Sequence, residues 1–208
     1  MAKTMAEMML DTITPLGFDI REPLNCHWES FWTHERRTKF LIRPEIQWPL
    51  SVDNMVWPSV AVSRMPAALN LWFSIGQILE VLPDLAFQNA DSPVLIEIGA
   101  VHDDQSSQYW EDLVNGWPQP RGEYEIKTGV QELGYDIADR YLLSGLSNCM
   151  LDPTELAGIR RAFSQRINSF GLFDQVGHAA DLRIVYNELI PEHAPFCVYR
   201  IRRINVAT

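Results

Sequence analysis

The sequence predicts a single α+β domain spanning residues 1–208. First, sixteen mostly apolar residues between two prolines form a helical pattern from Ala67 to Leu82. Second, Pro93 to Val101 is almost continuously apolar, which is typical of a strand buried on both faces. Third, the remaining helical and strand patterns alternate too irregularly to indicate a doubly wound parallel sheet. The expected architecture is a central buried helix over about 66–82, packed against a mixed sheet with several amphipathic helices.

The prolines suit the ends of that central helix. Pro66 fits a first helical position, where no amide donor is needed, and Pro83 cannot continue the hydrogen-bond ladder. A membrane span is the alternative, but sixteen residues give roughly 24 Å of helix, against about 30 Å of hydrocarbon. The polar residues fall on one narrow stripe: Asn70, Ser74, Gln77 and Glu80.

Further helices and strands are predicted from the spacing of apolar residues. Met5 to Ile13 predicts a short amphipathic helix ending before Pro15, without the apolar run of a signal peptide. A short helix is expected after Asn25. Two further amphipathic helices are expected, one carrying Val130, Leu133, Ile137 and Tyr141, the other beginning at Pro153 after an Asp152 cap and ending near Gly171. Strands are expected at 39–43, 56–63, 123–128, 182–186 and 196–206, the last with Arg200 and Arg202 on one face.

Charge is distributed unevenly along the chain. The formal net charge is −10, and Met65 to Pro120 contains no Lys or Arg but eight carboxylates; we call this the acidic segment. Seven arginines, including Arg200, Arg202 and Arg203, follow Ile159. The acidic balance opposes nucleic-acid binding and favours solubility or a basic partner. The arginines could pair with the acidic segment within one molecule or between two, which would give a homo-oligomer.

One candidate catalytic or metal site follows strand 93–101. Its residues are Glu97, His102, Asp103 and Asp104, which could hold a divalent ion or supply a general base for a small hydrolase. The alternative is a helix N-terminus whose acids complement the helix dipole.

Other candidates each have a structural alternative. Glu125 and Lys127, with Glu97 or Asp104, match the residue types of a metal-dependent nuclease, but an exposed ion pair explains them equally. Cys26, His27 and His34 suggest a metal site, but on one helix His27 and His34 would lie roughly 10 Å apart, so solvated or core histidines explain them better, and no cofactor is expected. Ser144, Ser147 and Cys149 lack a Gly-x-Ser-x-Gly elbow, so we interpret them as loop residues.

The favoured interpretation is protein binding. Aromatic side chains supply large contact areas at interfaces, and three tryptophans precede prolines. Three cysteines without a close pair indicate a cytoplasmic protein. We therefore expect a non-enzymatic binding module, such as an inhibitor or an immunity-type protein for a basic partner; the hydrolase and a structural subunit of an assembly are the alternatives. The expected contact residues are Trp48, Trp57, Trp117, Glu111 and Asp112.

Overall fold

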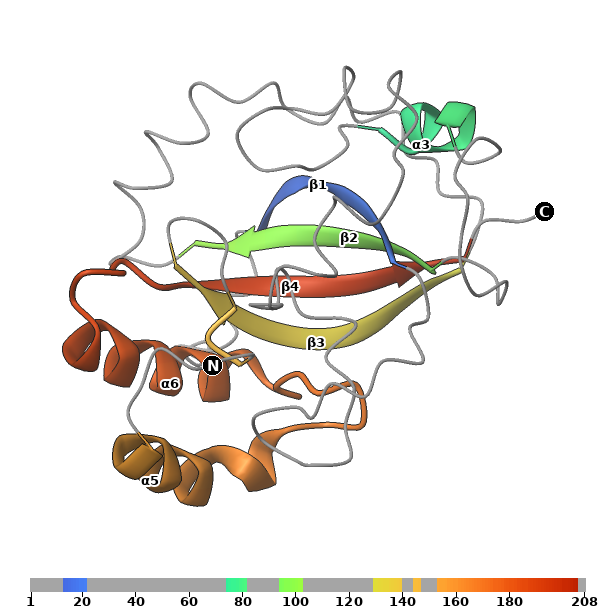
Figure 1. Cartoon of the computed structure of the whole chain (residues 1–208). Coiled ribbons are helices and arrows are strands. Elements are labelled where there is room, and N and C mark those ends of the chain that lie inside the picture. Colours follow the sequence, from blue (N-terminus) through green and yellow to red (C-terminus); the bar gives the residue numbers. More distant parts are fainter. Residues whose placement is uncertain are drawn as a thin grey trace, which may run out of the picture.

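The computed structural model describes residues 13–21, 74–81, 94–102, 129–139, 144–146 and 153–205. These residues form an α+β fold, as the sequence predicts (Figure 1). The strands are β1 (Ile13–Arg21), β2 (Val94–Val101), β3 (Val130–Ala138) and β4 (Cys197–Ile204). The helices are α3 (Ile75–Val81), α5 (Pro153–Phe163) and α6 (Val176–Leu189), with a 3-10 turn at Ser164–Arg166.

The strands form one sheet in the order β1-β2-β4-β3, with every neighbouring pair antiparallel. Strand β2 lies inside the sheet, and its residues 95–101 are all buried, which confirms the prediction from the apolar run. Strand β4, Cys197–Ile204, confirms the strand that the sequence predicts at 196–206. The expected mixed sheet is purely antiparallel in the part of the chain that the structure describes.

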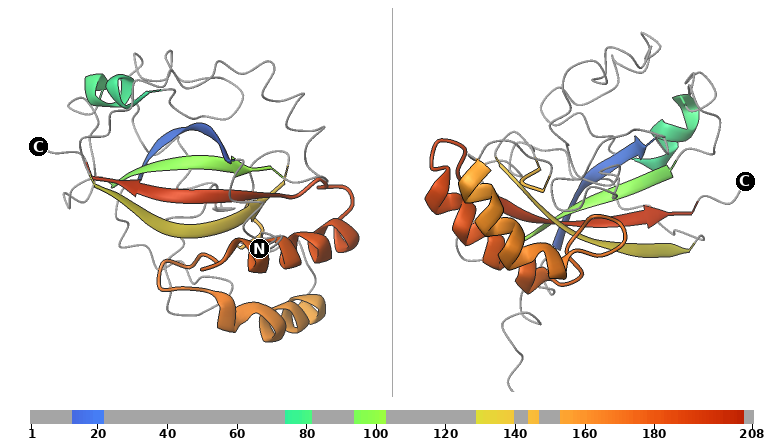
Figure 2. Two further views of the ribbon diagram at one scale, coloured as in Figure 1. Left: turned by 180° about the vertical axis from the view of Figure 1, so that it is seen from behind. Right: turned by 60° about the horizontal axis from the view of Figure 1, so that its bottom comes forward.

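Helix α6 contacts β3 and β4, and the two views of Figure 2 show α5 beside it on the same side of the sheet. Its buried side chains, including Ala179, Leu182 and Tyr186, join the sheet residues in one hydrophobic core. Tyr186 packs edge-on against Phe196 with ring centroids 5.2 Å apart. Aromatic burial of this kind anchors α6 to the start of β4.

The predicted central helix is not confirmed. Helix α3 begins at Ile75, because Ser74 and Gln77 form a reciprocal capping box: Gln77 N–H donates to Ser74 Oγ (3.2 Å) and Ser74 N–H donates to Gln77 Oε1 (3.1 Å). Ile78 is buried, but Leu79 is 44% exposed. Figure 1 shows α3 on the β1 side of the sheet, away from α5 and α6.

The helix predicted from Val130, Leu133 and Ile137 is wrong, because these residues belong to strand β3. The pairing of β3 with β4 shifts between Glu132 and Gly134, so a bulge breaks the two-residue alternation and imitates helical spacing. Gly134 has φ +137°, which a helix does not allow. It also lies against the loop that precedes α6.

Three other boundaries differ from the sequence prediction. Ile13 begins β1 rather than ending a helix; Pro15 and the bulge that follows it hide this strand from a pattern search, although an edge strand tolerates proline. The predicted strand 182–186 lies within α6, where Leu182 and Tyr186 are buried four residues apart and Ile184 is 46% exposed. Helix α5 begins at Pro153 as predicted but ends at Phe163, well before Gly171.

The helix after Asn25 and the strands predicted at 39–43, 56–63 and 123–128 lie outside the described residues.

Candidate functional site

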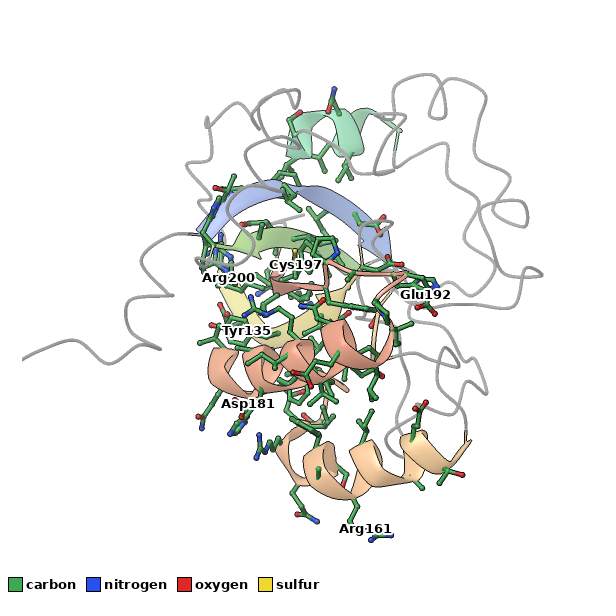
Figure 3. All side chains as sticks on the ribbon, turned by 90° about the vertical axis from the view of Figure 1, so that its left-hand side faces the viewer. Tyr135, Arg161, Asp181, Glu192, Cys197 and Arg200 are labelled. Carbon is green, nitrogen blue, oxygen red and sulfur yellow. The ribbon has the colours of Figure 1, made fainter. Side chains whose placement is uncertain are left out.

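One face of the sheet carries a group of charged side chains, which we call the ionic cluster. Arg202 is paired in register with Glu97 on β2 and with Glu132 on β3, and Arg200 is paired with Tyr135. Side chains of paired residues on neighbouring strands point to the same face. Figure 3 accordingly shows Arg200 and Tyr135 on the same side of the sheet.

Glu97 is the centre of the ionic cluster. Its side chain is 4% exposed, and both of its oxygens accept hydrogen bonds from Arg202 Nη2, at 2.7 and 2.6 Å. Arg200 Nη2 lies 3.7 Å from Oε1 of the same carboxylate. A carboxylate buried without a cation would be strongly destabilising, so these two arginines explain how β2 tolerates a glutamate in its apolar run.

The side of β2 next to this pair requires a glycine. A Cβ atom on Gly99 would lie 2.7 Å from Ile13 Cγ2 and 3.8 Å from Arg200 Nη2. The first distance is shorter than a carbon–carbon contact allows, so Gly99 lets the Ile13 side chain and the Arg200 guanidinium fold over the strand.

A second carboxylate balances the second arginine. The hydroxyl group of Tyr135 donates a hydrogen bond to Glu132, and partial desolvation raises the pKa of Glu132 although Arg200 and Arg202 act in the opposite direction. Burial, followed by the nearby Glu132 charge, raises the pKa of Tyr135 to about 12. The ionic cluster thus combines two guanidinium groups with two carboxyl groups, while Nε of Arg200 and Nε of Arg202 are buried without a hydrogen-bond partner among the described residues.

The carboxyl ends of β2 and β3 form a second polar region, which we call the sheet end. The pairs Ala100–Tyr199 and Ala138–Cys197 bring both ends together beside the start of β4. Asp139 follows β3 directly. Its side chain is fully buried, and its Oδ2 lies 2.9 Å from Nδ1 of His193, whose side chain is 32% exposed.

His102 lies at the same sheet end, directly after β2. Its Nε2 is 2.6 Å from Thr14 Oγ1, and burial lowers its pKa, so the neutral imidazole is favoured. His102 and the Asp139–His193 pair thus lie at the same edge of the sheet, after two strands that both pair with β4.

Ser144 has a structural role beside the sheet end. Its side chain is fully buried, its Oγ donates to Asp136 Oδ1 at 2.8 Å, and it accepts the Leu146 N–H at 3.1 Å. Tyr186 of α6 donates its hydroxyl hydrogen to the Gly145 carbonyl at 2.8 Å. These bonds fasten 144–146 between β3 and α6, in accord with the interpretation of Ser144 as a structural loop residue.

The structure does not bring Glu97 and His102 together. Thr14 is paired with Ala100 and bonds His102, so these residues share a face, whereas Glu97 is three residues before Ala100 and faces the other way. Across the described ranges, no three His, Cys, Asp or Glu side chains are grouped to hold a metal ion. The remaining candidates lie outside the described residues and stay predictions: Asp103, Asp104, Glu125, Lys127, Trp48, Trp57, Trp117, Glu111, Asp112, Cys26, His27, His34, Ser147 and Cys149.

Sequence reasoning missed Asp139 and His193 because 54 residues separate them. Weak signals were present: Asp139 ends an apolar strand, and His193 lies between two prolines in a turn. It also missed the partner of Glu97. A glutamate inside a buried strand requires a cation, and the alternating Arg200 and Arg202 were suitable candidates.

Comparison with known proteins adds no family. No protein-family model, curated protein or solved structure matches this chain. In the described part of the chain, every helix falls short of the length and apolar character needed to cross a membrane.

Proposed function

We propose that this protein is a binding module for a basic partner protein, which it contacts through the acidic segment. The acidic segment carries eight carboxylates without a Lys or Arg. Glu97 is buried, and an excess of negative charge along the rest of the segment would attract a positively charged partner and accelerate encounter.

The observation that carries this proposal is where the C-terminal arginines are bonded. Arg200 and Arg202 both pair with Glu97, which belongs to the acidic segment. Arg166 pairs at 2.8 Å with Asp181, which lies outside the acidic segment. Two arginines are thus directed at a single carboxylate of the acidic segment. The segment itself supplies no Lys or Arg to pair with its other seven acids.

The tryptophans supply the apolar part of the proposed interface. Trp48, Trp57 and Trp117 each precede a proline, which restricts the tryptophan backbone to extended conformations. A restricted aromatic side chain loses little entropy on binding, and aromatic anchors within a charged rim are typical of strong interfaces. Glu111 and Asp112 supply part of that rim in this proposal. A role as an inhibitor or immunity-type protein in the cytoplasm agrees with the net negative charge and with the odd number of cysteines.

The test begins with native mass spectrometry of the protein isolated at low salt from the cells that produce it. The proposal expects a stoichiometric protein partner of basic isoelectric point that dissociates at high salt, because exposed charges are screened beyond about 10 Å at 0.1 M salt. Isolation as a chain without any protein partner under these conditions would contradict the proposal.

Charge-reversal variants then locate the interface. Reversing Glu111 and Asp112 to lysine should weaken binding of the identified partner by about tenfold, equivalent to roughly 1.4 kcal/mol. The matched control reverses Glu188 and Glu192, which are exposed and lie outside the acidic segment, with the same change in net charge. Equal losses from both variants would show that net charge alone acts and would exclude the acidic segment as the contact surface.

A further inference from the structure

Two histidines in the described ranges are bonded to aspartates in the same way but in different surroundings. His193 Nδ1 lies 2.9 Å from Asp139, and His178 Nδ1 lies 2.9 Å from Asp174. The Asp174 side chain is 52% exposed, whereas the Asp139 side chain is fully buried. Solvent weakens the first interaction, while the lower polarisability around Asp139 strengthens the second.

The pairing determines how the His193 ring is presented. A carboxylate can only accept hydrogen bonds, so the proton of the neutral imidazole lies on Nδ1. The Nε2 lone pair is then available on a side chain that is 32% exposed. Buried carboxylates that hold a histidine in this tautomer are a recurring arrangement in enzymes that use the opposite nitrogen as a base.

The backbone around His193 is also held in place. Its N–H donates to the Ile190 carbonyl at 3.0 Å, and the next N–H, of Ala194, donates to the Pro191 carbonyl at 3.3 Å. Phe196 N–H donates to Asn187 Oδ1 at 2.8 Å, which closes the turn onto α6. Figure 3 shows the preceding residue, Glu192, on the opposite side of the molecule from Arg200, so the turn is separate from the ionic cluster. A base fixed in this way needs little reorganisation before proton transfer.

We propose that Asp139 and His193 form a general-base dyad that hydrolyses carboxylic esters. His193 Nε2 takes a proton from water while the water oxygen bonds to the acyl carbon. The bond between that carbon and the ester oxygen then breaks, and Nε2–H returns the proton to the departing alkoxide. The products are a carboxylic acid and an alcohol, without any change in oxidation state. His193 is the catalytic residue, and Asp139 is a positioning residue.

The chemistry of the dyad selects esters among hydrolysable substrates. An alkoxide or phenolate leaves an acyl carbon more readily than an unprotonated amide nitrogen, so a single base can suffice for an ester. Phosphodiester cleavage requires stabilisation of additional negative charge, and Arg200 and Arg202 are paired with Glu97 in the ionic cluster. This proposal goes beyond the binding function and does not depend on it.

The full chain tests the proposal with p-nitrophenyl acetate as the probe. The expected result is turnover that falls about 100-fold in His193→Gln, the range of general-base contributions. Asp139→Asn should lower kcat about tenfold or more, with a smaller change in KM, because the amide no longer fixes the tautomer. His178→Gln and Asp174→Asn are the matched controls and should leave turnover unchanged.

Two further readouts separate catalysis from folding. Free imidazole should restore turnover to His193→Ala above the rate that imidazole alone gives with this ester, whereas a misfolded variant should show only that background. The wild-type reaction should be slower in D₂O because proton transfer limits it. The proposal is overturned by three results: turnover that does not depend on His193, equal losses in the His178 and His193 variants, or folded variants that imidazole fails to rescue.

Discussion

Gly134→Ala should be among the most destabilising single-methyl additions in the described fold. A Cβ atom at this position would lie 2.4 Å from the Phe173 carbonyl oxygen and 2.8 Å from Asn168 Nδ2, and φ is +137°. The carbonyl belongs to backbone that pairs with Tyr135 in both directions at 2.9 Å, so it cannot move away without breaking those hydrogen bonds. The surrounding backbone therefore cannot accommodate the added methyl group without losing hydrogen bonds.

The expected loss has two parts. Backbone conformations with positive φ are unfavourable for L-residues by about 1–2 kcal/mol, and an overpacked site adds about 1–3 kcal/mol. We expect the free energy of unfolding to fall by about 3 kcal/mol. Gly158→Ala is the control, because nothing lies within 4 Å of its added Cβ in the exposed part of α5. That change should stabilise the protein by about 1 kcal/mol through helix propensity.

Urea unfolding followed by circular dichroism and tryptophan fluorescence measures both variants. The two probes should give coincident transitions with unchanged slopes, so that the midpoints report stability. If the free energy of unfolding of Gly134→Ala falls by less than about 1 kcal/mol, as for an ordinary surface substitution, the close packing of Phe173 and Asn168 against the β3 bulge is refuted.

Three other predictions concern ionisable groups. Glu97→Gln should destabilise the protein by about 3 kcal/mol in urea unfolding, because Arg202 is left without its anion, whereas a Glu97→Leu/Arg202→Leu double variant should recover most of that loss; a mild single variant would contradict the assigned pair. The raised pKa of Glu132 means that the folded state binds its proton more tightly, so stability should fall as pH rises from the ordinary value of 4.5 through the raised value, and Glu132→Gln should remove this part of the pH dependence. Burial raises the pKa of Cys197 to about 12, so a thiol reagent should modify it only as fast as the native fold opens, in a variant whose other two cysteines are serine; rapid labelling under native conditions would refute its buried position.

The sequence predicts some parts of this fold well for physical reasons. Strand β2 is recognisable because burial on both faces requires an uninterrupted apolar run, and the start of α5 because Pro153 suits a first turn. Strand β3 is not recognisable, since its bulge changes the apolar period from two to nearly that of a helix. The start of α3 was misplaced because two residues of its capping box, Ser74 and Gln77, also fit the polar stripe of a longer helix.

The candidate site was predictable only in part. His102 follows a strand that the sequence identifies, so its position at a sheet end could be inferred. The Asp139–His193 pair depends on how β3, α6 and β4 meet, and no local pattern records a contact between residues so far apart. Pairing Glu97 with Arg202 would have required the strand order, which places β4 beside β2 although about 95 residues separate the two strands.

The ionic cluster and the sheet end are linked by strand register. Side chains alternate between faces, so slipping β4 by one residue relative to β2 would move Arg200 and Arg202 onto the face where Ile201 joins the hydrophobic core. Two guanidinium groups placed in an apolar core would be strongly destabilising, and this penalty favours the observed register. The same register fixes Ala138 opposite Cys197 and therefore fixes where Asp139 leaves β3. The charged face of the sheet thus determines which residues meet at its end, where Asp139 and His193 are bonded.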